Sequence, residues 1–276
     1  MRVKFIYLLL VTILMSSCSG YNKILSNPDP EYRYTQAKKY FDEGKFSRSA
    51  TLLEDLVPVF KGTSYAEEAL YLLARSYYGM KDYTTASQYF TTYYTTYTKG
   101  QYAELSRFYA AYGLYKESPD PRLDQTNTHK AMQQFQEFLE YFPQSERKDE
   151  AQSILFELQE KLAYKELLAV RLYYNLGNYV VGYPFPGGNY ASSVITAENA
   201  LKMYPFSYYK EDFMYYVIMS KYAMAEQSVE DKKDSRFRDV IDEYYSYMNE
   251  FPGGKYLKQV QKIYENSQKK IKGNQI

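Results

Sequence analysis

Few residues in this chain could do acid–base, nucleophilic or metal chemistry. His129 is the only histidine and Cys18 the only cysteine among 276 residues. A zinc site, a Ser-His-Asp triad and a Cys-His pair each need more of these side chains than the chain holds. Chemistry by paired carboxylates stays open, but the acidic residues fall mainly at helical surface spacings and no pair stands out. We therefore expect no enzymatic activity, no metal and no cofactor, with His129 as a solvated or capping residue.

Cys18 has a different use, which its position suggests. Arg2 and Lys4 precede an apolar run over residues 5–15, and Ser16 and Ser17 come just before the cysteine. A basic start, a short apolar run and small residues are typical of a secretory signal, and the run is too short to span a bilayer. The pattern resembles the lipobox of bacterial lipoproteins, although Met15 stands where leucine is usual.

This interpretation divides the first part of the chain. Residues 1–17 are predicted to be a signal peptide, Cys18 to carry acyl chains such as palmitate, and residues 18–29 to form a lipidated tether. Several acyl chains on one residue give stable anchoring. The alternatives are a buried first helix and a chance Ser-Ser-Cys at the end of a signal.

The charge pattern gives no reason to expect nucleic acid as a partner. The chain has 34 basic and 33 acidic residues, a formal charge of +1, and loses two cations with the signal peptide. A near-neutral, interspersed charge exerts no general attraction on a polyanion. No later segment is apolar enough to cross a membrane.

The elements that position side chains are predicted to be helical repeats. Apolar residues recur at three-and-four spacing without strand alternation. Phe46 and Tyr83, each after a helix-breaking turn, lie 37 residues apart, and each is followed by a small residue and then a bulky one. This is the Ala-x-x-x-Phe step of the second helix in a tetratricopeptide repeat, where a small residue lets two helices cross closely. The steps are Ser49/Leu53, Ala86/Phe90, Ala131/Phe135, Ser193/Ala197 and Val240/Tyr244.

Prolines support the same register. Pro143, Pro205 and Pro252 each follow the second member of a step by eight residues, where a proline ends a helix. We therefore predict an all-α fold, an α-solenoid of about five tetratricopeptide-like helical hairpins. A generic helical bundle is the alternative.

Two interruptions break the period. Residues 117–127 lengthen the turn of repeat three, and residues 179–190, rich in glycine and proline, double the turn of repeat four. We place repeats one and two in residues 30–110 and repeats three to five in residues 111–276. The second insertion carries Tyr183 and Phe185, which we predict to contact a partner. Packing onto the neighbouring hairpin is the alternative.

The first helices of stacked hairpins line a concave face. The register predicts a tyrosine-rich groove with cations one repeat apart, which suits an extended peptide with aromatic side chains and a free carboxylate. Some of these rings are expected to pack between helices instead. The groove residues are Tyr34, Lys38, Tyr71, Arg75, Tyr78, Phe108, Tyr112 and Tyr115.

At this point the sequence resembles the BamD-type lipoproteins of the outer-membrane β-barrel assembly machinery. The most specific stretch is residues 161–179, with a paired Tyr-Tyr before a Gly-x-Tyr turn. The Asp-Pro loop before Ala131, the Tyr-Phe-Pro-x-Ser run at 141–145 and the lipobox are similar too. The insertion after Tyr179 and the high tyrosine content depart from the family pattern.

The resemblance implies a function. It implies a scaffold anchored to the outer membrane by lipid and facing the periplasm. Such a protein docks on the periplasmic domains of an Omp85-type barrel subunit and receives unfolded outer-membrane proteins. A glycan-binding lipoprotein and a cell-wall-associated repeat protein are the competing hypotheses, although the absence of tryptophan disfavours the first.

Overall fold

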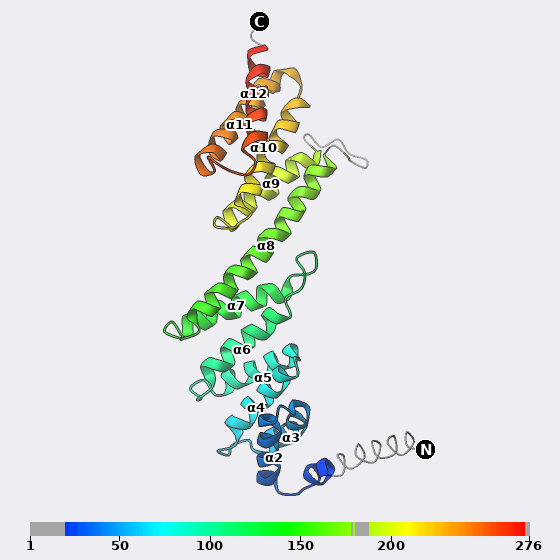
Figure 1. Ribbon diagram of the computed structural model, residues 1–276, viewed down its shortest axis with the longest axis vertical. Helices are drawn as coiled ribbons and strands as arrows, with labels where there is room; N and C mark the ends of the chain where they lie inside the picture. The colour runs from blue at the N-terminus through cyan, green and yellow to red at the C-terminus, as the bar shows by residue number, and fades with distance from the viewer. Residues whose placement is uncertain (1–19, 178, 180–187, 274–276) are drawn as a thin grey trace, which may run out of the picture. The chain divides into compact units, whose positions relative to one another are not determined.

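The computed structural model describes residues 20–177, 179 and 188–273. These residues form helices and turns without a strand, which confirms the all-α prediction (Figure 1). Among them, no helix combines the length and the apolar character that crossing a bilayer requires. The chain divides into two compact units, residues 1–119 with 125–155 and residues 120–124 with 156–276.

Unit 1 consists of antiparallel hairpins whose helix ends are set by local sequence. Asp29 accepts hydrogen bonds from the backbone N–H groups of Glu31 and Tyr32, and Pro30 follows it in the first turn. A side-chain acceptor before the helix and a proline at its start are favoured at an N-terminus. The helices are α2 Pro30–Asp42, α3 Phe46–Val59, α4 Ala66–Gly79, α5 Tyr83–Thr96, α6 Ala103–Lys116 and α7 Thr126–Tyr141.

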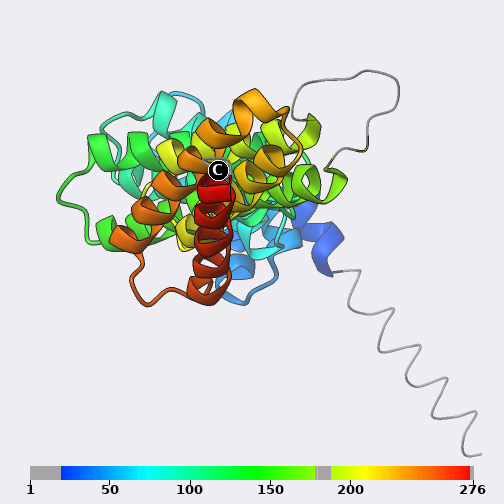
Figure 2. The ribbon, with the colours of Figure 1, turned by 90° about the horizontal axis from the view of Figure 1, so that it is seen from above.

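Unit 2 continues the same architecture. The helix α8, Lys148–Leu176, supplies its first residues to unit 1 and the rest to unit 2. It is followed by α9 Gly188–Met203, α10 Lys210–Glu226, α11 Glu230–Glu250 and α12 Leu257–Gly273. The first turn of α9 includes residues 188–190, which the sequence had placed in the loop of repeat four. The last helix α12 packs on α10 and α11 (Figure 2). It buries Val260 and Ile263 against them.

The predicted small residues lie where helices cross. Ser49, Ala86, Ala131, Ser193 and Val240 are fully buried. Two of the crossings are joined by serine pairs, because Ser76 donates to Ser49 over 3.2 Å and Ser220 donates to Ser193 over 3.0 Å. The proline prediction also holds: α7, α9 and α11 end two residues before Pro143, Pro205 and Pro252. The repeat register is therefore confirmed.

At several repeat junctions a glutamate joins one repeat to the next. Glu67 in the first turn of α4 accepts hydrogen bonds from the buried Tyr93 hydroxyl and from the N–H of Gln101, over 2.7 Å in the second case. In α10, Glu211 accepts from the Tyr247 hydroxyl at 2.6 Å and from the N–H of Tyr256 at 3.3 Å. In both cases a first helix holds the turn that opens the following first helix. We call this contact the glutamate clasp.

Related contacts occur at two further junctions. Glu104 of α6 accepts from the Ser145 hydroxyl at 2.5 Å. Glu160 of α8 accepts from the Ser207 hydroxyl and the Tyr208 N–H, both at 3.1 Å. Hydrogen bonds to a charged acceptor stabilise more than neutral ones. The clasps therefore fix the spacing of the first helices, which carry the candidate site.

Candidate functional site

Three aromatic residues predicted to line the groove belong to the core of unit 1. Tyr34, Tyr71 and Phe108 are 4%, 6% and 1% exposed. Tyr71 stacks on Tyr102 with ring centroids 4.0 Å apart, and Phe108 packs edge-on against a second helix at Phe135. These rings fill the space between neighbouring first and second helices, so their faces are covered.

Lys38 also has a partner within unit 1. Its Nζ lies 2.6 Å from a carboxylate oxygen of Glu68. Burial disfavours the charged carboxylate, but the hydrogen bond and the charge of Lys38, together with the Tyr34 hydroxyl, outweigh burial and lower the pKa of Glu68. Because the pair is largely neutralised, Lys38 is the weaker of the two predicted cations as an anchor for a carboxylate.

Arg75 on α4 is the cation that remains available. Its guanidinium lies over the rings of Phe41, Tyr71 and Tyr109, at 5.8, 5.8 and 5.5 Å from their centroids. It donates a hydrogen bond to the Tyr71 hydroxyl over 3.1 Å. Among the residues that the structure describes, no carboxylate lies within 4.0 Å of it. The aromatic rings hold the guanidinium in place while its charge stays unneutralised.

A hollow of about 500 Å³ lies beside this guanidinium. It lies where the end of α2, the start of α3 and the end of α4 meet. Its lining includes Phe41, Phe46, Arg75, Tyr78 and Gly79. The hollow therefore combines aromatic walls with one cation, Arg75, and one carboxylate, Asp42, which forms no ion pair with Arg75. The rings and the unpaired cation suit an aromatic side chain close to a carboxylate.

Aromatic rings continue from this hollow onto α6. Tyr78 packs edge-on against Tyr109 at 5.1 Å and tilted against Tyr112 at 6.3 Å, and Tyr112 contacts Tyr115 at 5.5 Å. Burial and then the neighbouring tyrosines raise the pKa of Tyr78 to about 12, so its hydroxyl stays protonated and can donate. We call Phe41, Arg75, Tyr78, Tyr109 and Tyr112 the Arg75 site.

Arg147, in the turn before α8, adds a second cation to this surface. It lies 4.7 Å from the ring centroid of Phe108 and 5.4 Å from that of Tyr109, and it pairs with Glu150 at 2.9 Å. Sequence reasoning missed both Arg147 and Tyr109. The only available signal was composition, since both lie outside the 37-residue register that led to Arg75.

Comparison with known proteins shows which family the chain belongs to. The family profile of YfiO, described as an outer membrane lipoprotein, matches residues 27–182, which include the whole Arg75 site. The chain belongs to this family. A curated protein of Aquifex aeolicus (strain VF5), named as a candidate outer membrane protein assembly factor BamD, is 25% identical over 251 residues. The alignment covers 86% of this chain and 74% of that protein.

The family assignment confirms the BamD-type resemblance and associates the chain with the outer membrane. Cys18, Tyr183 and Phe185 lie outside the described residues, so the lipid site and the partner loop remain predictions. The base of that loop is closed by the N–H of Asn189, which donates to the Gly177 carbonyl over 2.9 Å. Among the described residues, no group of three potential metal ligands occurs.

Unit 2 of this YfiO-family protein carries a buried carboxylate that the sequence did not reveal. Asp212, with 3% exposure, accepts a hydrogen bond from the Tyr256 hydroxyl at 2.8 Å. Lys255 pairs with it at 2.6 Å and Arg171 at 3.4 Å. Burial and then the hydrogen bond to Asp212 raise the pKa of Tyr256. Since a buried carboxylate requires compensation, this cluster holds α8, α10 and the turn before α12 together.

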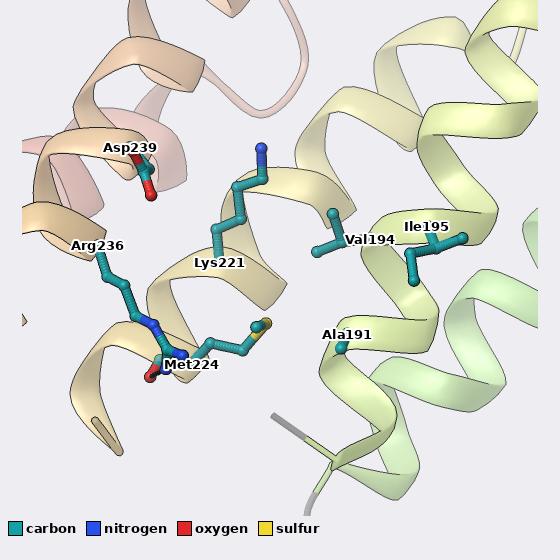
Figure 3. Close-up of a pocket in the computed structure, with 7 residues that line it drawn as sticks. All are labelled: Ala191, Val194, Ile195, Lys221, Met224, Arg236 and Asp239. Carbon is teal, nitrogen blue, oxygen red and sulfur yellow. Dashed lines mark hydrogen bonds between the residues drawn. The ribbon is translucent and has the colours of Figure 1, made fainter. Parts of the chain in front are cut away.

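A separate cavity of about 240 Å³ lies between α9, α10 and α11 (Figure 3). It is lined by Ala191, Val194, Ile195, Lys221, Met224, Arg236 and Asp239. Burial opposes the charge of Lys221, but the hydrogen bonds and charges of Glu243 and Glu198 outweigh it and raise the pKa of Lys221. Arg236 donates to the Ser228 hydroxyl at 2.6 Å. Both cations are thus engaged by their own unit, and the cavity is mainly apolar.

Proposed function

We propose that this chain is a non-catalytic scaffold and substrate receptor in the assembly of β-barrel proteins into the outer membrane. Membership of the YfiO family and the similarity to a BamD-named protein support this role. In this proposal Cys18 carries the lipid anchor, the repeats face the periplasm, and an Omp85-type barrel subunit binds the scaffold through its periplasmic domains.

The observation that carries the receptor role is the state of Arg75. A half-buried guanidinium held over three rings, without a carboxylate partner among the described residues, is prepared for an incoming anion. Arginine binds a carboxylate by two parallel hydrogen bonds. Because the aromatic rings already fix the side chain, binding a ligand costs less conformational entropy than ordering a mobile arginine would.

The hollow beside Arg75 suggests which anion would bind. The last strand of a barrel protein alternates apolar and polar residues and often ends in an aromatic residue with a free carboxylate. In our proposal the carboxylate binds Arg75 and the terminal ring enters the hollow next to Phe46 and Tyr78. Further rings of the strand then contact Tyr109 and Tyr112 on α6. Buried aromatic and arginine anchors usually dominate such interfaces.

The test is binding of a fluorescent peptide that represents the C-terminal strand of a barrel protein. Arg75→Glu should weaken binding strongly because it reverses the charge, whereas Arg75→Lys keeps the charge but loses the paired geometry and should weaken binding less. Amidation of the peptide's C-terminus should reproduce part of the loss for the wild-type protein and have little further effect on Arg75→Glu.

A matched control is Arg48→Glu. Arg48 also lies over two tyrosine rings, Tyr21 and Tyr40, but on α3, so its reversal should leave peptide binding unchanged. Circular dichroism must show that each variant is folded. If Arg75→Glu and Tyr78→Ala both bind the peptide like wild type, the Arg75 site is not the receptor.

A further inference from the structure

The turn between α9 and α10 exposes a group of large apolar side chains. Phe206 is 87% exposed, Tyr208 76% and Met203 63%. Among the described residues, no ring packs against Phe206, and Tyr208 contacts only the ring of Phe156, at 5.3 Å. Isolated exposed apolar residues are ordinary, but a group of them on one projecting turn marks a contact surface.

The repeat pattern shows that the fold does not require these side chains. The five turns that follow the second helices each begin with an aromatic residue, namely Phe60, Tyr97, Phe142, Tyr204 and Phe251. Two residues later the other turns carry Gly62, Lys99, Gln144 and Gly253, where this turn has Phe206. Four residues after the first aromatic they carry Ser64, Gln101, Glu146 and Lys255, where this turn has Tyr208. Two positions that carry polar or small residues in the other four turns are therefore aromatic in this turn.

The surroundings favour a lipid surface over a protein pocket. The apolar residues lie at the exposed tip of the α9–α10 hairpin, and exposed aromatic side chains on a short turn can enter the interfacial region of a bilayer. Lys202, in the last turn of α9, is exposed, and Lys210 begins α10, where it pairs with Glu250. Aromatic residues flanked by lysines are typical of the membrane–water interface.

We infer that Met203, Phe206 and Tyr208 form a second membrane contact, which enters the lipid interface in addition to the lipid anchor. The YfiO family comprises outer membrane lipoproteins, so the folded units work within reach of a bilayer. One weak contact does not hold a protein on a membrane, but added to a lipid anchor it fixes the orientation of the attached domain. The inference depends on membrane attachment and not on peptide binding at the Arg75 site.

The absence of tryptophan from the chain makes a direct test possible. The lipidated full-length Phe206→Trp variant contains a single tryptophan at the tip. It is reconstituted into vesicles of phosphatidylethanolamine and phosphatidylglycerol, with and without brominated lipid. The inference predicts a blue-shifted emission that brominated lipid quenches. Gln144→Trp, at the equivalent position of another turn, is the matched control and should emit as in water without quenching.

Two results would overturn the inference. The tryptophan at 206 could be quenched no more than the one at 144, which means that the tip stays in water. Its emission could instead shift only when a purified assembly subunit is added and remain insensitive to brominated lipid, which makes the turn a protein contact. Phe206→Gln is the stability control: it should melt at the wild-type temperature, because the exposed Phe206 ring contributes nothing to the core.

Discussion

Gly254 should be indispensable to the glutamate clasp of unit 2, whereas its neighbour Gly253 should not. A Cβ added at Gly254 would overlap the Tyr247 hydroxyl and the Glu211 carboxylate, while one added at Gly253 would meet no atom within 4 Å. Neither glycine has a positive φ, so alanine is conformationally acceptable at both. The pair Gly254→Ala and Gly253→Ala therefore separates steric loss of the clasp from any general effect of replacing glycine.

The expected loss of stability in Gly254→Ala follows from the groups that must move to make room for the added Cβ. Tyr247 is fully buried, so its ring has little room to move. The turn at Gly254 must therefore shift away from the Tyr247 hydroxyl, and the Glu211 carboxylate is displaced from between them. The protein then loses the hydrogen bonds from the Tyr247 hydroxyl and from the N–H of Tyr256. Hydrogen bonds to charged groups contribute about 1.5–3 kcal/mol each, and part of this is recovered from water. We expect Gly254→Ala to lower the free energy of unfolding by about 2–4 kcal/mol.

Gly253→Ala should be neutral, or stabilising by about 0.4–1 kcal/mol, because alanine restricts the unfolded chain. The assay is thermal and urea unfolding followed by circular dichroism. For a unit of this size, a loss of 2–4 kcal/mol lowers the melting temperature by roughly 8–16 °C. Equal melting temperatures for the two variants would show that the clasp adds no stability. A loss in Gly253→Ala alone would contradict the geometry of the turn.

Three further predictions concern the core, the anchor and pH. Ala86→Asp should destabilise unit 1 by several kcal/mol in urea unfolding, because a fully buried carboxylate has no partner at the helix crossing; the exposed Thr84→Asp on the same helix should be neutral, and equal midpoints would refute the packing argument. Cys18→Ser should leave the protein unprocessed or soluble in membrane fractionation, and full retention of Cys18→Ser in the outer membrane after an alkaline wash would argue against lipid at this residue. Burial raises the pKa of Tyr78 to about 12, so the folded state holds the proton more tightly than the unfolded chain, whose tyrosines titrate near about 10; this stability is complete below about pH 10 and is lost as the pH rises through about 12. The urea midpoint should fall over that range, and less steeply in Tyr78→Phe.

The fold could be predicted because the geometry of a helical repeat determines the spacing of small and bulky residues along each helix. The position of Ala86 or Ala131 within a step determines which helix face crosses its partner, and the prolines mark where second helices end. The fully buried steps of the structure follow this register. The clasps had no comparable signal in the amino-acid pattern, since Glu211 reaches a backbone N–H 45 residues away and a single glutamate in a helix is usually a surface residue.

The candidate site was predictable only in part. A 37-residue register identifies which face of a first helix points away from its own hairpin, and it located Arg75. The register does not predict how deeply each side chain is buried. Tyr34, Tyr71 and Phe108 lie on that face but are covered by neighbouring helices. The register also missed Tyr109 on α6. The Arg75 guanidinium lies over the ring of Tyr109, which stands 34 positions along the chain and therefore outside the 37-residue register.

The glutamate clasp gives the Arg75 site an energetic connection along the chain. Arg75 and Glu67 lie on the same helix, and Glu67 holds the turn from which α6 carries Tyr109. A ligand that bridges α4 and α6 would therefore act on the junction that the Glu67 carboxylate already holds together. Occupancy of the site should slow amide exchange at Gln101, whose N–H is the closing bond. If the site binds a ligand, strain at this junction reaches the adjacent hairpin first, because each repeat contacts only its neighbours.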